Sequence, residues 1–286
     1  DRRLTPANTR VAAEHLRGTV DAPRYAAGEQ RMVVEGVVDL LRAPGGARDR
    51  QLLMGAGVTV YEDHEGWSFV QTLADGYVGY VAIQTLGQVA EVTHRVDARA
   101  THVYSTPDFK SPELVTLSYG AQLSVLRDAL GFEPDRPGRF VQTAQGFVPR
   151  MHLVPVASRA ADPVAEAEKL LGTPYLWGGN SAFGIDCSGL VQGALAACGQ
   201  SCAGDSDLQE QTLGRTVPLG TAPERGDLLF WKGHVAWVAG PDLLLHANAY
   251  SMSVTVEPLR EAVARIETQG DGPVTRHARL IEEAFI

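Results

Sequence analysis

The sequence predicts an α+β fold in which two small β-barrels precede a domain that begins with helices and ends with strands. Two observations predict this order. Residues 31–157 contain an internal repeat of short, alternating apolar segments separated by Gly, Pro, Asp and Asn. Residues 160–286 instead carry helix-start and helix-stop signals followed by apolar strands. The 286 residues suit two or three domains of roughly 100–200 residues each.

Residues 1–30 are predicted to form an N-terminal arm that packs on the rest of the chain, with a short helical stretch over residues 9–16. The first residues lack the apolar core of a secretory signal, so the expected location is the cytoplasm. A signal removed before Asp1 would instead make the protein secreted.

The internal repeat has two copies, which define the predicted domains 31–90 and 91–157. Gly55 of the first copy corresponds to Gly120 of the second at an offset of 65, and the offset rises to 71 later in the copies. The second copy therefore carries six additional residues, around 131–138. Each copy contains several short strands, which is typical of a small β-barrel.

The C-terminal domain begins with two predicted helices. Asp162, followed by a proline, is the N-cap of the first helix, and Gly172 ends that helix. The second helix begins near Cys187, has apolar residues at helical spacing and ends at Gly199. Three strands are then predicted, at residues 227–231, 234–239 and 243–247.

Composition argues against several partners. The net charge of −9 disfavours nucleic acid and anionic membrane surfaces, which bind basic stripes. No apolar run approaches the ~18 residues of a membrane span, so no membrane insertion is expected. The three cysteines, Cys187, Cys198 and Cys202, imply no disulfide framework, and no second pair or nearby His completes a metal site around the last two. The oligomeric state stays open.

Cys187 lies where a loop becomes a helix, which makes it a candidate nucleophile. Unpaired N–H groups and the helix dipole favour a thiolate there. Ser188 and Gly189 follow and offer backbone N–H groups to an oxyanion. The alternative is that Cys187 is only a small apolar residue of the first helical turn.

Two histidines complete a candidate catalytic set with Cys187. His234 opens one strand and His246 lies near the end of the next, across a turn at residues 240–242. A hairpin about this turn is expected to place residue 234 opposite residue 246, within one position, with Cβ atoms ~4.5–5.5 Å apart. One imidazole can then orient the other, as in a catalytic triad. The alternative is a pair of core histidines. We interpret the remaining histidines as surface or incidental residues: His15, His64, His94, His102, His152 and His277.

Five blocks of the C-terminal domain occur in a familiar order. Residues 172–179 read GTPYLWGG, and residues 184–191 read GIDCSGLV. The later blocks are GDLLFW at 226–231, HVAWV at 234–238 and LHA at 245–247. Together they resemble the signature of the NlpC family of cell-wall cysteine peptidases. The resemblance implies a papain-like catalytic domain, and the repeat copies resemble the bacterial SH3-like domains that often precede cell-wall hydrolases.

The resemblance also implies a function. It points to the γ-D-glutamyl-L-diamino acid endopeptidases with two SH3-like domains, which bind L-Ala-γ-D-Glu with its free amine held by acidic groups. The expected partner is thus a peptidoglycan-derived peptide, L-Ala-γ-D-Glu followed by diaminopimelate or lysine, cleaved during wall recycling. No metal or organic cofactor is expected. An amidase or acyltransferase on the same scaffold stays open, as does a non-catalytic wall-binding protein.

Residue by residue, the resemblance implies a set of substrate-binding positions: Asp186, Ser188, Tyr175, Trp177, Asp205, Ser206, Tyr77 and Asp49. Tyr77 resembles a tyrosine that closes the pocket from outside. Simpler roles stay open, because Asp186 and Asp205 are also suited to capping helices, Tyr77 to barrel core and Trp177 to packing under the Gly-rich loop. The chain departs from the family at residues 202–204, where relatives often carry Arg.

Overall fold

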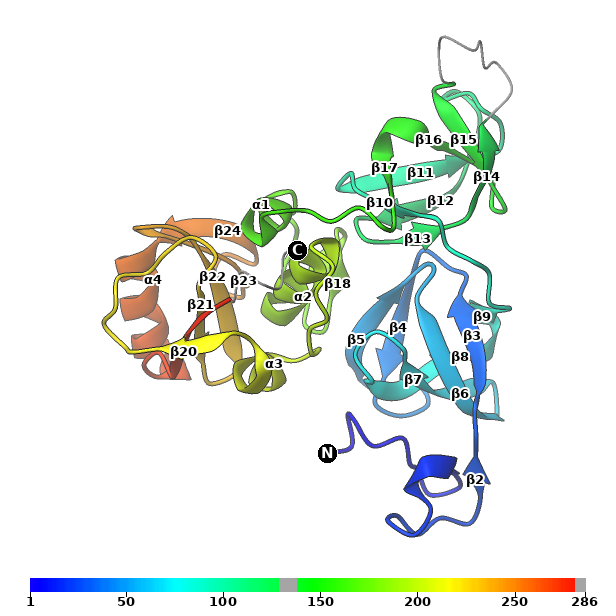
Figure 1. Ribbon diagram of the computed structural model, residues 1–286, viewed down its shortest axis with the longest axis horizontal. Helices are drawn as coiled ribbons and strands as arrows, with labels where there is room; N and C mark the ends of the chain where they lie inside the picture. Colours follow the sequence, from blue (N-terminus) through cyan, green and yellow to red (C-terminus); the bar gives the residue numbers. More distant parts are fainter. Residues whose placement is uncertain (129–137, 281–286) are drawn as a thin grey trace. The chain divides into compact units, whose positions relative to one another are not determined.

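The computed structural model describes residues 1–128 and 138–280, and the chain divides into two compact units, Asp1–Val156 and Ala157–Ile286 (Figure 1). Almost all of the predicted insertion around 131–138 lies outside the described residues. Within the described residues, no helix has the length and apolar character needed to span a membrane.

The first unit contains a seven-stranded antiparallel sheet. Its strand order is β5-β4-β8-β7-β6-β3-β9. The strands are β3 (Glu29–Val33), β4 (Val37–Leu41), β5 (Arg48–Leu53), β6 (Gly57–His64), β7 (Trp67–Thr72), β8 (Val78–Ala82) and β9 (Leu86–Gly87), with a 3₁₀ turn η2 (Ile83–Thr85) before β9. Leu40, Val60, Val70 and Val81 belong to the hydrophobic cluster that this sheet encloses. The alternating apolar positions thus form one core, as the period of two predicts.

The second repeat copy forms two smaller sheets around a second hydrophobic cluster, which includes Leu117 and Val148 and also Met54 of the first copy. One sheet has the order β12 (Glu113–Ser118), β11 (Ala100–Tyr104), β16 (Phe147–Pro149), β15 (Phe140–Thr143) and β14 (Val125–Asp128). The other has the order β13 (Gln122–Leu123), β10 (His94–Val96) and β17 (Leu153–Pro155), with a 3₁₀ turn η3 (Arg150–His152) before β17. Gly55 and Gly120, which the repeat aligns, have similar positive φ angles of 85° and 84°. Two SH3-like domains nevertheless stay a prediction.

The N-terminal arm packs on the seven-stranded sheet but is not the helix predicted over residues 9–16. Its residues form β1 (Ala12–Ala13), paired with β2 (Tyr25–Ala26), and only the 3₁₀ turn η1 (Glu14–Leu16) is helical. Val11 and Ala13 are buried against Tyr61 and Phe69. A short helix is marginal by itself, so packing on the sheet decides the backbone conformation.

The second unit is built on a six-stranded antiparallel sheet. The order is β20 (Arg215–Val217), β25 (Arg276–Arg279), β21 (Leu228–Trp231), β22 (His234–Gly240), β23 (Leu243–Asn248) and β24 (Ser253–Pro258). Figure 1 shows α4 (Leu259–Ile266) on one side of this sheet and α2 (Cys187–Ala197) on the other. The remaining elements are α1 (Pro163–Glu168), α3 (Ser206–Thr212), a hairpin of β18 (Asn180–Ser181) and β19 (Gly184–Ile185), and the π-helical turn η4 (Glu267–Asp271). This α+β architecture fits the papain-like catalytic domain expected from the resemblance.

The predicted helices and strands of this unit are present at nearly the predicted bounds. The Asp162 carboxylate caps α1 by accepting from the N–H of Val164 at 2.8 Å. α1 ends at Glu168, and a short turn follows before Gly172, whose φ is 76°. α2 ends two residues before Gly199, whose φ is 78°.

The interpretation of His277 as a surface or incidental residue is wrong. Its side chain is buried on β25, and its Nε2 lies 2.7 Å from Oδ2 of the buried Asp227. The guanidinium of Arg279 donates to both oxygens of the same carboxylate at 2.8 Å. The sequence contains no local signal for this cluster, because β25 pairs with β21 across some fifty residues of chain.

Candidate active site

Cys187 is the first residue of α2, and the Asp186 side chain holds the start of that helix. The Asp186 carboxylate accepts from the N–H of Gly189 at 2.7 Å, from Oγ of Ser188 at 2.9 Å and from the N–H of Gly178 at 3.0 Å. The first contact is an N-cap, and the last ties the Gly-rich loop to the helix. Asp186 therefore has the capping role left open above, and its carboxylate sets the position of the nucleophile.

Burial controls the protonation of the Cys187 thiol. Burial raises the pKa of Cys187 to about 12, and the Asp186 carboxylate adds to the rise. Backbone N–H groups of Val235, Ser188 and Cys187 itself lower this pKa, as expected at a helix start, but burial outweighs them. The thiolate predicted from the helix dipole is therefore not the resting form, and the thiol needs a base to remove its proton.

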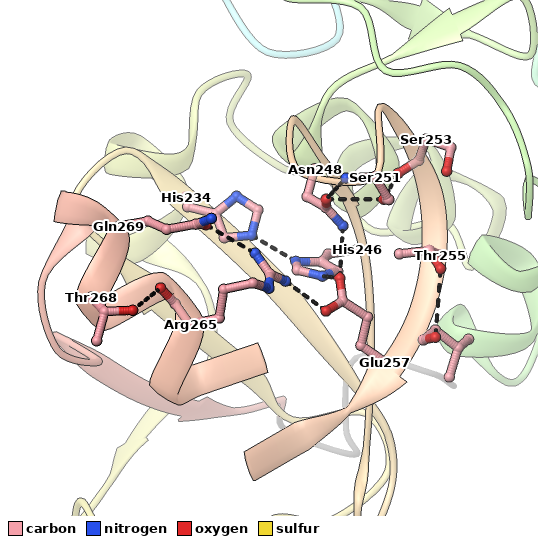
Figure 2. Close-up of polar contacts among 11 residues, drawn as sticks. His234, His246, Asn248, Ser251, Ser253, Thr255, Glu257, Arg265, Thr268 and Gln269 are labelled. Atoms are coloured by element: carbon pink, nitrogen blue, oxygen red, sulfur yellow. Dashed lines mark hydrogen bonds and ion pairs between the residues drawn. The ribbon is translucent and has the colours of Figure 1, made fainter. Parts of the chain in front are cut away.

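His234 and His246 lie on the neighbouring strands β22 and β23, where Nε2 of His234 is 2.8 Å from Nδ1 of His246 (Figure 2). The predicted direct opposition of the two residues is wrong. Trp237 pairs with Leu245, so the same register places position 236 opposite His246. The two rings meet across the diagonal, which is within reach of aromatic side chains. The difference arises from the centre of the turn, because Gly240 pairs with Leu243, whereas opposition of residues 234 and 246 requires a hairpin centred on residue 240.

The electrostatic setting keeps His234 neutral. Burial lowers the pKa of His234 to about 3, and His246 and Arg265 lower it further, while Glu257 acts in the opposite direction. A neutral imidazole has one acceptor nitrogen, so it can take a proton from a thiol. The N–H of Val235, the residue after His234, hydrogen-bonds to Cys187. The candidate base and the candidate nucleophile therefore belong to one site.

Glu257 and Arg265 are residues of this site that the sequence interpretation missed. Oε1 of Glu257 lies 3.1 Å from Nε2 of His246, and Oε2 lies 2.6 Å from Nη2 of Arg265. Hydrogen bonds from His246 and Arg265 outweigh burial and hold the pKa of Glu257 at about 2, so it is a carboxylate. A charged residue at an inward position of β24 is the signal that could have identified it, but neither β24 nor α4 was predicted.

The structure gathers several of the predicted substrate-binding residues near α2. The buried Gln209 on α3 donates from Nε2 to the carbonyl of Ser188 at 3.0 Å, which joins α3 to the first turn of α2. Asp205 precedes α3 without capping it through its side chain, and Ser206 is the first residue of α3. The hydrogen bond of Gln209 therefore connects α3, with Asp205 and Ser206 at its start, to α2.

The two aromatic residues of the Gly-rich loop differ in exposure. Tyr175 is half-buried, and its N–H donates to the carbonyl of Met252 at 2.9 Å. The side chain of Trp177 is 70% exposed, so it does not pack under its own loop. A large exposed aromatic residue beside the site is available for contact with a ligand.

Tyr77 and Asp49 belong to the first unit and have structural partners there. Tyr77 is buried in the cluster of the seven-stranded sheet, with the guanidinium of Arg50 at 5.5 Å from its ring. The Asp49 carboxylate pairs with Arg2 at 2.7 Å and Arg42 at 2.9 Å. Their roles in substrate recognition stay predictions. Among residues 1–128 and 138–280, no cluster of three or more His, Cys, Asp or Glu side chains could hold a metal ion.

A thiol at a helix start, a neutral imidazole on the adjoining sheet and a second imidazole behind it make up the site of a cysteine hydrolase. Residues 172–270 match the model of the NlpC/P60 family, and residues 40–86 match the bacterial dipeptidyl-peptidase SH3 domain. Residues 172–270 are thus similar to the NlpC/P60 family, a family of cysteine peptidases and hydrolases, and residues 40–86 are similar to a bacterial SH3 domain. The SH3 match lies in the first repeat copy.

Curated relatives include proteins named as peptidases. Dipeptidyl-peptidase 6 of Lysinibacillus sphaericus is 29% identical over 229 residues, which are 74% of this chain and 84% of that protein. The gamma-D-glutamyl-L-lysine dipeptidyl-peptidase of Bacillus subtilis is 36% identical over 128 residues, which are 41% of this chain and 43% of that protein. A crystal structure of an NlpC/P60 family protein from Bacillus cereus aligns with a TM-score of 0.70 at 20% identity, over 88% of this chain and 99% of that one. This last similarity supports the fold.

Proposed function

We propose that this protein is a cysteine peptidase that hydrolyses the bond between γ-D-Glu and the following diamino acid, diaminopimelate or lysine, in peptidoglycan-derived peptides. The observation that carries the proposal is the 2.8 Å contact between His234 and His246, together with the hydrogen bond from the N–H of Val235, the residue after His234, to Cys187 at the start of α2. The similarity to two relatives supports this substrate class. They are a dipeptidyl-peptidase of L. sphaericus and a gamma-D-glutamyl-L-lysine dipeptidyl-peptidase of B. subtilis.

The reaction is acyl transfer to sulfur and then to water. Nδ1 of His234 takes the proton of the Cys187 thiol, and the sulfur attacks the γ-carbonyl carbon of D-Glu. Backbone N–H groups at the start of α2, including that of Cys187, stabilise the oxyanion. His234 returns the proton to the departing amine of the diamino acid, and then removes a proton from the water that releases the dipeptide.

Recognition is assigned to the residues around the start of α2. In this proposal Asp186, Asp205 and Ser206 hold polar groups of L-Ala-γ-D-Glu, and Tyr175 and Trp177 contact its apolar parts. Ser188, Tyr77 and Asp49 complete the proposed set. A requirement for a free L-Ala amine would suit short peptides released from the wall, so we assign the protein to wall recycling in the cytoplasm. Recovery of the mature protein outside the cytoplasm would contradict that assignment.

The decisive experiment compares L-Ala-γ-D-Glu-L-Lys with the same peptide acetylated at its amine. Wild type and Cys187→Ala are incubated with each peptide, and products are identified by mass. The expected result is cleavage of the free-amine peptide by wild type alone. Equal cleavage of both peptides by wild type would show that the protein is a peptidase that does not recognise the free amine of L-Ala.

Two further outcomes would replace the proposal. Transfer of the acyl group to an added amine in preference to water would indicate an acyltransferase on this scaffold. Absence of cleavage, together with tight binding of Cys187→Ala to insoluble peptidoglycan, would indicate a wall-binding protein.

A further inference from the structure

A polar layer of Glu257, Arg265 and Asn248 adjoins His246, and Glu257 contacts the ring nitrogen of His246 that does not face His234 (Figure 2). Glu257 accepts from all three neighbours. Its Oε1 is 3.1 Å from Nε2 of His246 and 3.2 Å from Nδ2 of Asn248, and its Oε2 is 2.6 Å from Nη2 of Arg265. The His246 side chain, which contacts His234 through one ring nitrogen and Glu257 through the other, is fully buried.

Donor and acceptor roles in this layer are determined by groups that can act in one way only. Oδ1 of Asn248 accepts from the backbone N–H of Ser251 at 2.8 Å, so its Nδ2 is the atom that faces Glu257. Arg265 can only donate. It is held on its other sides by Oε1 of Gln269 at 3.1 Å and by the ring of Tyr250, 4.1 Å from the guanidinium carbon. Glu257 is therefore surrounded by donors.

The hydrogen-bond direction propagates from Glu257 to the base. Because an ionised carboxylate only accepts, His246 must carry its proton on Nε2. Its Nδ1 then has a lone pair and accepts from Nε2–H of His234. A neutral His234 with its proton on Nε2 has its lone pair on Nδ1, the ring nitrogen left for the thiol.

We propose that Glu257, held by Arg265 and Asn248, is a positioning residue that sets the tautomers of His246 and His234 and thereby directs the basic nitrogen of His234 to Cys187. The inference rests on the proposed roles of Cys187 and His234. It adds two residues and a direction of proton transfer to the site, and it does not depend on which peptide is the substrate.

The wild-type protein alone tests the first step. Ring ¹⁵N shifts of labelled histidines should show His234 and His246 protonated on Nε2 and bare on Nδ1. Assignment uses the variants His234→Gln and His246→Gln. Protonation of either ring on Nδ1 at neutral pH would overturn the inference without any mutation of Glu257.

The variant Glu257→Gln tests the consequence. The charged Arg265 is a stronger donor than Asn248, so the amide oxygen of the new side chain should face Arg265, and its amide nitrogen should face His246 and Asn248. His246 then accepts at Nε2 and donates from Nδ1, which forces the His234 proton onto the nitrogen facing Cys187. Substitution of the orienting carboxylate by an amide has this inverted-tautomer effect in the serine protease triad.

The readout is the alkylation rate of Cys187 by iodoacetamide, which needs no peptide substrate, together with kcat and KM for the free-amine tripeptide. Glu257→Gln should lower the alkylation rate and kcat by roughly 10- to 100-fold, as loss of a partner behind a histidine ligand does, with KM nearly unchanged. Glu261→Gln, the same exchange at an exposed position of α4, is the matched control and should behave as wild type. An unchanged alkylation rate in Glu257→Gln would refute the inference.

A second substitution separates positioning from loss of packing. In Glu257→Gln/Arg265→Met the amide is free to turn its oxygen toward His246, so the alkylation rate should recover several-fold over the single variant. A double variant as slow as the single one, or slower, would indicate a structural role only. If wild type did not cleave the tripeptide, the proposed substrate would be rejected. The role of Glu257 would still be tested, because the ring ¹⁵N shifts and the alkylation rates are measured without a peptide.

Discussion

Nε2 of His234 and Nδ1 of His246 are 2.8 Å apart although the two residues are not cross-strand partners. Position 236, opposite His246, is an alanine on the same face of the sheet, and its methyl group leaves room for the diagonal contact. The pair therefore depends on both rings being turned toward each other. His246 is fully buried, so its orientation is set by its hydrogen bonds rather than by solvent.

Loss of the orienting ring should cost less than loss of the nucleophile. In His246→Ala the base keeps its position on β22 but loses its acceptor, so the His234 proton can occupy either nitrogen. We expect kcat for the free-amine tripeptide to fall by roughly 10²- to 10³-fold, within the range of general-base contributions. Cys187→Ala should leave no turnover above background. Equal and complete losses in the two variants would contradict the orienting role of His246.

The pH profile of kcat should lack the fall at acidic pH that protonation of a histidine base usually causes. The reactive form has neutral His234 and a protonated Cys187. Because burial lowers the pKa of His234 to about 3 and raises that of Cys187 to about 12, this form persists both below and above neutrality. We expect kcat at saturating peptide to be flat between about pH 5 and pH 9, whereas an unperturbed histidine would give a limb near ~6.5.

We choose kcat because ionisation of the peptide amine changes substrate binding, and therefore KM, but not the rate at saturating peptide. Circular dichroism at each pH excludes acid unfolding. An acid limb near ~6.5 with folded protein would show that His234 titrates as an exposed imidazole does.

The candidate catalytic set could be located in the sequence because each member has a local signal. A cysteine at a loop-to-helix junction and histidines in two strands joined by a Gly-Pro-Asp turn can be located without tertiary information. The contact between the two histidines was predictable to the level of neighbouring strands, whereas the register depended on where the turn is centred, which the Gly-Pro-Asp sequence did not reveal.

Tertiary packing determines what the sequence could not predict. Glu257 and Arg265 meet only because α4 lies against the sheet, and neither residue has a motif around it. The protonation of Cys187 depends on its burial, which outweighs the helix-start contribution that local sequence does indicate. The arm shows the same limit at residues 11–13, where burial against the sheet replaces the predicted helix with extended chain.

Two glycines of α2 should respond oppositely to a methyl group. A Cβ at Gly189 would lie 2.4 Å from the carbonyl oxygen of Gly179, so Gly189→Ala must displace the loop from the helix start. We expect a loss of about 1–3 kcal/mol in the free energy of unfolding, as for other overpacked sites, and slower alkylation of Cys187. A Cβ at Gly193 meets nothing within 4 Å, so Gly193→Ala should stabilise the helix by about 0.5–1 kcal/mol.

Urea unfolding of both variants measures the two effects. If Gly193→Ala destabilised the protein as much as Gly189→Ala, α2 would tolerate a methyl group at neither position. The loss in Gly189→Ala could then not be attributed to the contact with Gly179.

The buried Asp227 should make the stability of the second unit depend on pH. Burial raises the pKa of its carboxyl, but hydrogen bonds from Arg279, the N–H of Glu224 and His277 outweigh burial and lower it overall. A carboxyl whose pKa is lower in the folded protein than in the unfolded chain stabilises the fold at pH values above its unfolded-state pKa of about 3.9. This contribution is lost as the pH falls through the folded-state pKa. Asp227→Asn should therefore destabilise the unit most at neutral pH, by about 3–5 kcal/mol if the buried pair is broken.

Fluorescence of the buried Trp231 and Trp237 reports unfolding of this unit in urea. The difference in unfolding free energy between wild type and Asp227→Asn should narrow below about pH 4, where the Asp227 carboxyl of the unfolded chain begins to take up a proton while the folded one is still ionised. Glu168→Gln, which removes a more exposed ion-pair partner of Arg225, is the control and should change the free energy by less than about 1 kcal/mol at any pH. A difference for Asp227→Asn that stays constant from pH 7 to pH 3 would mean that the neutral side chain is as well accommodated as the carboxylate, and that packing between β21 and β25, rather than charge, accounts for the loss.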